Sequence, residues 1–203
     1  MSTERISTRS GDLEFEFGIP TPDTASHLYD ELDYQRACQA YLWAIPAVGS
    51  SGWRKANHFY GGTGDCDLVS YKEPSVVAGI LTPNSTVAYV MAFPDLSRTG
   101  PLVWELPPGP LGGGVATVFQ QPVSDVGLTG PDRGEGAKYL LVGPSQDVPE
   151  EVDGYRVMHV PSVLPMVGVR ILAPTIEDQK KLFSELSLYP HSARDNRPEQ
   201  RRI

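Results

Sequence analysis

The chain has 203 residues, a formal net charge of −8 at pH 7 and two cysteines. The acidic excess makes nucleic acid and anionic membranes unfavourable partners, because both would repel the protein. Cys38 and Cys66 lie in unlike sequence contexts, so neither a disulfide framework nor a cysteine-based metal site is expected. The four histidines are scattered without H-x-x-x-H or H-E-x-x-H spacing, and we expect no metal and no cofactor.

The opening residues, MSTERISTRSGDLEFEF, are polar and lack the apolar run of a secretory signal. No apolar stretch approaches the length needed to cross a bilayer. We therefore expect a soluble, cytoplasmic protein with no membrane partner, in which residues 1–10 form a flexible N-terminus.

The first predicted elements are a strand and a helix. Apolar and acidic residues alternate in LEFEF at 13–17, a period of two that predicts an edge strand. An apolar helical stripe then runs through residues 34–45, and we expect the helix to end where Pro46 cannot donate the next hydrogen bond. The GSSG segment at 49–52 follows, and we interpret it as a loop that leaves this helix.

Residues 76–172 consist of short apolar runs separated by turns rich in glycine and proline, a pattern typical of β structure. Both faces of the run at 86–93 are apolar, so we expect this strand at the centre of a sheet. The predicted strands are Val77–Leu81, Thr86–Phe93, Leu102–Leu106, Val115–Val123, Lys138–Val142, Tyr155–Val160 and Met166–Leu172.

A second helix is predicted after Pro174-Thr175, because Glu177 and Asp178 suit the positive end of a helix dipole. The fold class is therefore α+β and mainly β. About seven strands form a sandwich- or barrel-like arrangement, on which an N-terminal helical segment and the C-terminal helix pack. We expect one β-rich domain at residues 11–189, followed by a flexible, linker-like tail at 190–203 with four arginines.

Two glycine-rich segments call for a choice between structure and chemistry. Gly112-Gly113-Gly114 resembles a phosphate-binding loop only superficially, since no Lys-Ser/Thr follows, and we interpret it as a hairpin or linker. The segment GPDRGEG at 130–136 offers two acidic side chains to a cation, but it lacks the other acidic positions of a calcium loop. A wide turn between strands is the simpler interpretation.

Polar residues gather where the apolar strands are expected to end. They either brace backbone groups at the strand ends or line a polar pocket, and both interpretations stay open. The candidate ligand-binding residues are Asn84, Thr86, Tyr89, Trp104, Gln120 and Asp125.

The same segments resemble the domain-of-unknown-function family 1254. The matching stretches include LTPNSTVAYVMAFPDLS at 81–97, GPLVWELPPGPLGGG at 100–114 and QQPVSDVGLTGPDRGEGAKYLLVGP at 120–144. The resemblance implies a β-rich first domain that a proline-containing linker joins to a second β-rich domain, numbered 1214, and this second domain is absent from the chain. Many relatives carry T-P-N-x-D-T, and Thr86 takes the acidic place here.

The sequence alone does not reveal a reaction. Our first hypothesis is a small-molecule-binding or interaction module that packs on a second β-rich domain or associates with itself. The alternative is a hydrolase-like enzyme with a polar site at the strand ends, in which Asp125 acts as the base, Asn84 and Gln120 polarise the substrate, and Lys138 or His159 assists.

Overall fold

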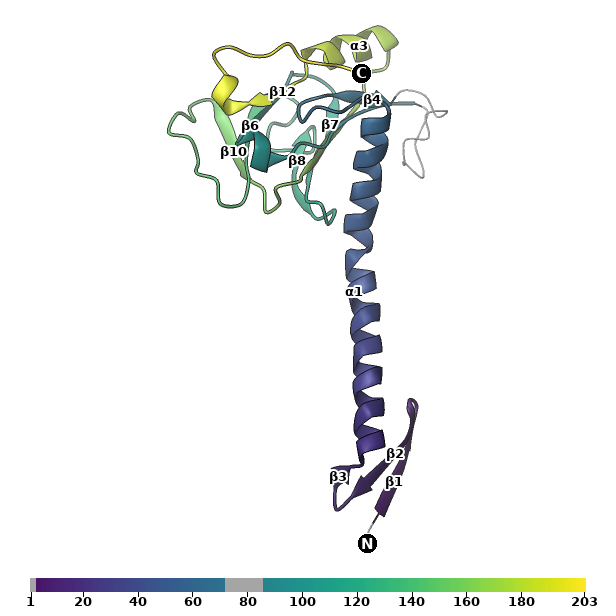
Figure 1. Ribbon diagram of the computed structural model, residues 1–203. Coiled ribbons are helices and arrows are strands. Elements are labelled where there is room, and N and C mark those ends of the chain that lie inside the picture. Colours follow the sequence, from purple (N-terminus) through teal and green to yellow (C-terminus); the bar gives the residue numbers. More distant parts are fainter. Residues whose placement is uncertain (1–2, 72–85) are drawn as a thin grey trace. The chain divides into compact units, whose positions relative to one another are not determined.

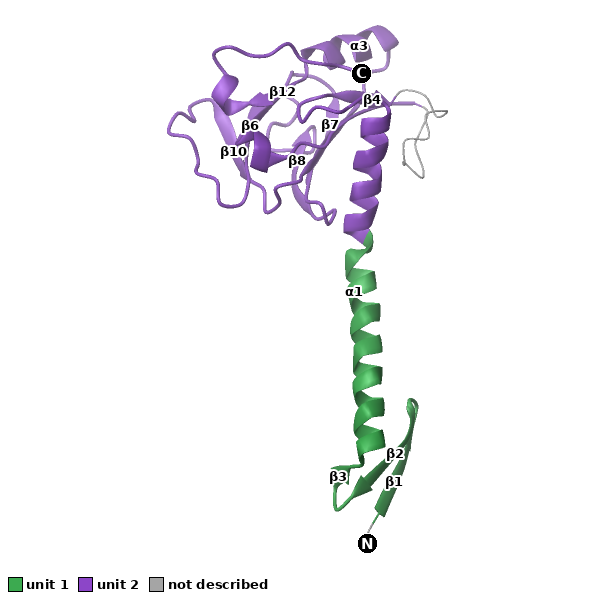
Figure 2. Ribbon diagram, in the orientation of Figure 1, with its two compact units in different colours: residues 1–45 green, residues 46–203 purple. Residues whose placement is uncertain are grey.

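The computed structural model describes residues 3–71 and 86–203. The chain divides into two compact units, residues 1–45 and residues 46–203 (Figure 2). Helix α1 (Pro22–Phe59) contributes its first part to the smaller unit and the part from Pro46 onward to the larger one.

The smaller unit is a three-stranded antiparallel sheet followed by the start of α1. Its strands are β1 (Thr3–Thr8), β2 (Gly11–Glu16) and β3 (Ile19–Pro20). The Thr24 hydroxyl accepts a hydrogen bond from the Glu14 amide at 2.8 Å and so joins the helix to the sheet. Strand β2 matches the strand predicted from LEFEF, whereas β1 lies in the segment expected to be flexible. All six residues of β1 are exposed, so no apolar pattern marks it.

Helix α1 does not end at Pro46, and the prediction that it does is wrong. Proline removes one backbone donor inside a helix, which costs stability, but packing beyond it compensates. Trp53 makes an edge contact with Phe93, with ring centroids 5.6 Å apart, and buried Asn57 accepts a hydrogen bond from the Tyr71 hydroxyl at 2.6 Å. The GSSG segment at 49–52 is accordingly a helical turn and not a loop.

The larger unit contains two β-sheets (Figure 1). One sheet has the strand order β4-β5-β11-β7-β8, and the other has the order β10-β9-β6-β12. The strands are β4 (Val69–Tyr71), β5 (Ala88–Ala92), β6 (Leu102–Leu106), β7 (Leu111–Ala116), β8 (Pro122–Gly127), β9 (Ala137–Val142), β10 (Tyr155–His159), β11 (Met166–Ile171) and β12 (Ser187–Pro190).

One hydrophobic core joins the two sheets. Val90, Val169 and Ile171 of the first sheet cluster with Trp104 and Leu141 of the second, and all five are buried. Burying one face of each sheet against the other is the arrangement of a β-sandwich. The predicted fold class, α+β and mainly β, is confirmed.

Five predicted strands lie where they were expected, as β5, β6, β9, β10 and β11. The predicted strand Val115–Val123 is wrong, because β7 ends at Ala116 and β8 begins at Pro122. A turn separates them in which Gln120 adopts a positive φ of 60°. The strand predicted at Val77–Leu81 lies outside the described residues.

Apart from α1, the helices described in the larger unit are short. They are α2 (Leu96–Thr99), α3 (Ile176–Glu185) and a 3-10 turn at His191–Ala193. Helix α3 matches the second predicted helix, and its cap is the Thr175 hydroxyl, which accepts a hydrogen bond from the Asp178 amide at 3.1 Å.

The last residues, expected to form a flexible tail, make specific hydrogen bonds. The Leu68 amide donates to the Arg201 carbonyl, and the backbone of Ile203 both donates to Leu68 and accepts from Ser70. The Arg202 guanidinium donates to carbonyl oxygens at the end of α3, including that of Leu186 at 2.8 Å. These contacts use backbone and arginine groups, which apolar patterning does not reveal.

Candidate functional site

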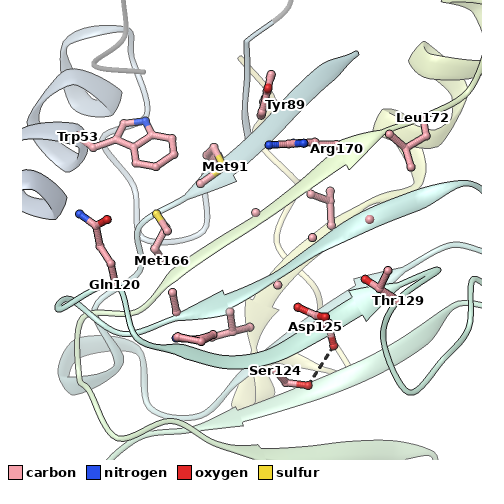
Figure 3. Close-up of a pocket in the computed structure, with 18 residues that line it drawn as sticks. Trp53, Tyr89, Met91, Gln120, Ser124, Asp125, Thr129, Met166, Arg170 and Leu172 are labelled. Atoms are coloured by element: carbon pink, nitrogen blue, oxygen red, sulfur yellow. Dashed lines mark hydrogen bonds between the residues drawn. The ribbon is translucent and has the colours of Figure 1, made fainter. Parts of the chain in front are cut away.

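A cavity of about 540 Å³ lies on the face of the five-stranded sheet that points away from the sandwich core (Figure 3). Side chains alternate along each strand, so the residues between the core positions face this cavity. On β11, Val167 and Val169 belong to the core cluster, and the alternate residues Met166, Gly168 and Arg170 line the cavity.

The strand register places the lining residues in two rows. The first row runs Met91, Gly168, Gly114, Asp125 across β5, β11, β7 and β8. The second row runs Tyr89, Arg170, Gly112 across the first three of these strands. Residues directly opposite in an antiparallel sheet share a face. The floor of the cavity is therefore mostly glycine, with larger side chains on either side.

Close packing explains why glycines form this floor. A Cβ atom on Gly168 would lie 2.3 Å from the Met91 sulfur, and one on Gly114 would lie 2.7 Å from the Ser124 carbonyl oxygen. Both separations are too short for real contacts. The interpretation of Gly112-Gly113-Gly114 as a hairpin or linker is wrong, since all three residues lie inside β7.

Helix α1 and the β7–β8 turn approach the cavity at one end. Trp53, Gln120 and Met166 lie near one another there (Figure 3). The Gln120 amide nitrogen donates to the Pro46 carbonyl oxygen at 3.1 Å, which fixes the turn to the helix. Its positive φ is an unfavourable conformation for a side chain with a Cβ atom.

The polar groups of the cavity carry opposite charges on different strands. The Arg170 guanidinium carbon lies 5.0 Å from the centre of the Tyr89 ring, a cation–π contact (Figure 3). Asp125 on β8 is exposed, and its backbone carbonyl accepts a hydrogen bond from the Ser124 hydroxyl at 3.0 Å. The cavity thus offers a cationic group and an anionic group on either side of the glycine floor.

The structure brings together three of the predicted site residues, Tyr89, Gln120 and Asp125. Trp104 is only 2% exposed and belongs to the sandwich core. Thr86 is exposed and is not among the described residues that line the cavity, and Asn84 lies outside the described part of the chain.

The proposed helpers of a hydrolase lie on the other sheet. Lys138 is on β9, where its ammonium group lies 3.7 Å from a Glu105 carboxylate oxygen, and His159 ends β10. The described residues that line the cavity include no histidine, cysteine or lysine.

Sequence reasoning missed the glycine floor, Trp53 and Arg170. A signal was available for Arg170, because it shares the period-two face of β11 with Gly168 and Met166. No such signal existed for Trp53, because the helix was expected to end before it.

The segment 130–136 is a turn between β8 and β9, as interpreted from sequence. Asp132 is 2% exposed and accepts hydrogen bonds from the Gly127 amide at 2.8 Å and from the Tyr139 hydroxyl at 2.5 Å. Burial, and then the Asp132 carboxylate, raise the pKa of the Tyr139 hydroxyl above its ordinary value. Asp132 therefore stabilises the turn through buried hydrogen bonds. Within residues 3–71 and 86–203, no group of three or more His, Cys, Asp or Glu side chains is placed to hold a metal ion.

A family model described as "Protein of unknown function (DUF1254)" matches residues 68–190. This chain belongs to the DUF1254 family. The match confirms the family that the sequence motifs indicate, and it includes the strands β4 to β12 and every cavity residue except Trp53.

Among solved structures, this DUF1254 chain is similar to the VPA0106 protein from Vibrio parahaemolyticus, with 17% sequence identity and a TM-score of 0.49. The similarity covers 78% of this chain and 40% of that one, so the chain spans less than half the length of this relative. A comparison with curated proteins gives no match. None of the helices in the described ranges combines the length and the apolar character that a membrane crossing requires.

Proposed function

We propose that this DUF1254 domain is a small-molecule-binding module whose ligand occupies the glycine-floored cavity. The observation that carries the proposal is the floor itself. Glycines of β7 and β11 leave the centre of one sheet face without side chains, while the flanking strands β5 and β8 place Tyr89, Met91 and Asp125 around it. Binding sites are typically concave and mostly apolar, with a few polar groups that orient the ligand.

The polar groups indicate the kind of ligand. A planar ligand ring that lies on the glycine backbone would contact Met91 and Met166. Arg170 and Asp125 carry opposite charges, so they suit a ligand that has both a hydrogen-bond acceptor and a hydrogen-bond donor. The cation–π contact with Tyr89 favours one position of the Arg170 guanidinium before the ligand binds.

Binding is better supported than hydrolysis. Hydrolysis by a serine nucleophile needs a base within hydrogen-bond reach of the hydroxyl. The Ser124 hydroxyl instead donates to a backbone carbonyl, and Lys138 and His159 lie on the other sheet. Of the residues that the hydrolase-like alternative names, Asp125 and Gln120 line the cavity, Lys138 and His159 do not, and Asn84 lies outside the described residues.

A matched pair of glycine variants tests the proposal. A library of small aromatic compounds is screened by ligand-observed NMR against the wild-type chain, and hits are measured again with Gly112→Leu and Gly52→Leu. Gly112 lines the cavity, and a Cβ there meets only Leu172 at 3.6 Å, so leucine fills the cavity without a clash at Cβ. A Cβ on Gly52 would meet no atom within 4 Å, and this residue does not line the cavity.

We expect hits that Gly112→Leu abolishes and Gly52→Leu retains. Arg170→Gln is expected to weaken the same hits by roughly tenfold, the value of one charge-assisted hydrogen bond. Hits that Gly112→Leu leaves unchanged, or a screen without any, would refute the proposal.

The second part of the proposal is a protein partner, either the second β-rich domain that the family resemblance implies or another copy of the chain. It is supported by exposed apolar side chains on the first part of α1: Tyr34 is 68% exposed, Tyr41 is 72% and Ile45 is 49%. These residues follow helical spacing and share one face, and large exposed apolar patches mark interaction surfaces.

Light scattering coupled to size exclusion tests this second part. The chain alone is expected to associate at rising concentration, and the double variant Tyr41→Lys, Ile45→Lys is expected to reduce that association. Wild-type chain that stays monomeric throughout would count against another copy of the chain as the partner, and association that the double variant leaves unchanged would count against this face of α1 as the interface.

A further inference from the structure

A second cavity, of about 250 Å³, lies beside the later part of α1 in the larger unit. It is distinct from the glycine-floored cavity, although Met166 lines both. Three basic or imidazole side chains of α1 line it, Arg54, Lys55 and His58. None of the described residues that line this cavity is acidic.

Helical spacing gathers these groups on one face. Positions 51, 54, 55 and 58 follow the i, i+3, i+4, i+7 pattern, so their side chains lie on one face of the helix. The opposite wall is apolar and is formed by Phe93, Val118, Leu164, Pro165 and Met166. The cavity therefore has a cationic side and an apolar side.

Ser50 supplies an independent sign of a ligand. It lines the cavity and is only 6% exposed, and its hydroxyl oxygen has no hydrogen-bond partner among the described residues. A buried polar group without a partner costs free energy, and such a group calls for an explanation. The hydrogen of a serine hydroxyl rotates about the Cβ–Oγ bond, so Ser50 can donate to an acceptor placed in the cavity.

The Arg54 guanidinium retains donors for such an acceptor. Among the described residues it forms one ion pair, with Asp65, at a nitrogen–oxygen distance of 4.0 Å. Both oxygens of Asp65 are taken by Arg98, at 2.7 and 2.8 Å. Arg54 is also largely enclosed, with its side chain 22% exposed, and a guanidinium in such surroundings pairs well with a carboxylate in two-point geometry.

We propose that this cavity binds a small monocarboxylate with a compact apolar body. The carboxylate accepts hydrogen bonds from Arg54 and Ser50, Lys55 adds attraction at the exposed side, and the apolar body contacts Phe93 and Pro165. The volume is below the usual range of about 300–1,000 Å³ for drug-sized ligands, which restricts the ligand to roughly one ring or one short branched chain.

Benzoate is the probe, and isothermal titration calorimetry of the whole chain at low salt is the measurement. Benzamide has the same shape without the charge, acetate has the charge without the ring, and phenyl phosphate has a larger anion. Benzoate is expected to bind at least tenfold more tightly than each of the three. Equal or tighter binding of benzamide or phenyl phosphate would overturn the carboxylate assignment, as would the absence of benzoate binding.

Variants assign the binding to this cavity. Arg54→Gln is expected to weaken benzoate binding by about tenfold, and Ser50→Ala by about threefold to tenfold, the range for one typical lost hydrogen bond. Ser50→Ala removes an unsatisfied group, so it should keep or raise the urea midpoint of unfolding. A merely structural role of Ser50 would lower that midpoint instead.

Two further variants keep the test decisive if Arg54→Gln unfolds the chain. Lys55 is exposed, so Lys55→Gln is expected to preserve folding and to weaken binding by about threefold, as for one charge removed from a partly exposed site. Lys180→Gln on α3 lines neither cavity and is the control that should leave benzoate binding unchanged. Benzoate binding that responds to Arg170→Gln and not to the α1 variants would refute the proposal.

Discussion

Alanine substitution of the three consecutive glycines of β7 should give three different results. A Cβ at Gly112 would lie 3.6 Å from a Leu172 methyl carbon, an ordinary contact. A Cβ at Gly114 would lie 2.7 Å from the Ser124 carbonyl oxygen, and one at Gly113 would lie 2.1 Å from the Gly168 carbonyl oxygen. Each of these two neighbours is a backbone atom of an adjacent strand, so it cannot move independently of the sheet.

The sign and size of each effect follow from these distances. Gly112→Ala restricts the unfolded chain without strain in the fold, and should raise the free energy of unfolding by about 0.4–1 kcal/mol. To reach an ordinary 3.4 Å contact, Gly114→Ala must open its strand pair by 0.7 Å (3.4 minus 2.7), and Gly113→Ala by 1.3 Å (3.4 minus 2.1). Overpacking of this kind costs about 1–3 kcal/mol, and we expect Gly113→Ala at or beyond the upper limit.

Urea unfolding followed by tryptophan fluorescence measures all three free energies. Gly52→Ala is the control, because it lies in a helix with open space around it and should stabilise by about 0.8–1 kcal/mol. Two results would contradict this prediction: similar decreases in the unfolding free energy of all three β7 variants, or a decrease of more than about 1 kcal/mol for Gly112→Ala. In either case the effect would depend on the loss of glycine itself and not on the distance to the neighbouring backbone.

Three other predictions concern the turn between β8 and β9, the N-terminal cap of α3 and the Cys66 thiol. Asp132→Ala leaves the Gly127 amide and the Tyr139 hydroxyl without their acceptor, and should lower the free energy of unfolding in urea by about 2–4 kcal/mol. Asp132→Asn keeps one acceptor oxygen and should lower this free energy by less. Thr175→Ala removes the cap of α3 and should lower the unfolding free energy by about 1 kcal/mol, whereas a change below about 0.3 would argue against the cap. Burial, with lesser contributions from Asp65 and Asp67, raises the pKa of the Cys66 thiol to about 12. Below that pH the thiolate of Cys66 is the minor form. Alkylation of Cys66 by iodoacetamide at pH 8 should therefore be far slower than alkylation of exposed Cys38, and it should accelerate as the pH approaches 12. Equal alkylation rates of the two cysteines at pH 8 would refute this prediction.

The sequence predicts those elements whose side chains alternate between the core and solvent. Strand β6 was predicted at its exact bounds, because Leu102, Trp104 and Leu106 face the sandwich core. Helix α3 was predicted from its capping residues. Long-range packing determined the other elements: α1 continues past Pro46 because of contacts that Trp53 and Asn57 make far along the chain.

The candidate site was predicted only in part, for a related reason. Polar side chains near strand ends mark Gln120 and Asp125, and Tyr89 stands out as an aromatic residue near them. The floor is made of glycines, which carry no side chain to suggest a site, and their role depends on the register of four strands. Trp104 was misplaced because a tryptophan on a strand fits a core as well as a pocket rim.

The pairing of the last residues with Leu68 and Ser70 has a consequence for how the molecule behaves among its neighbours. Among the described residues, β4 is the outermost strand of its sheet, and its outward-facing amides and carbonyls would otherwise be open to a strand from another molecule. The backbone of Arg201 and Ile203 already occupies those groups. Aggregation by strand addition at this border must therefore first displace the chain's own residues, and deleting residues 201–203 would remove that protection.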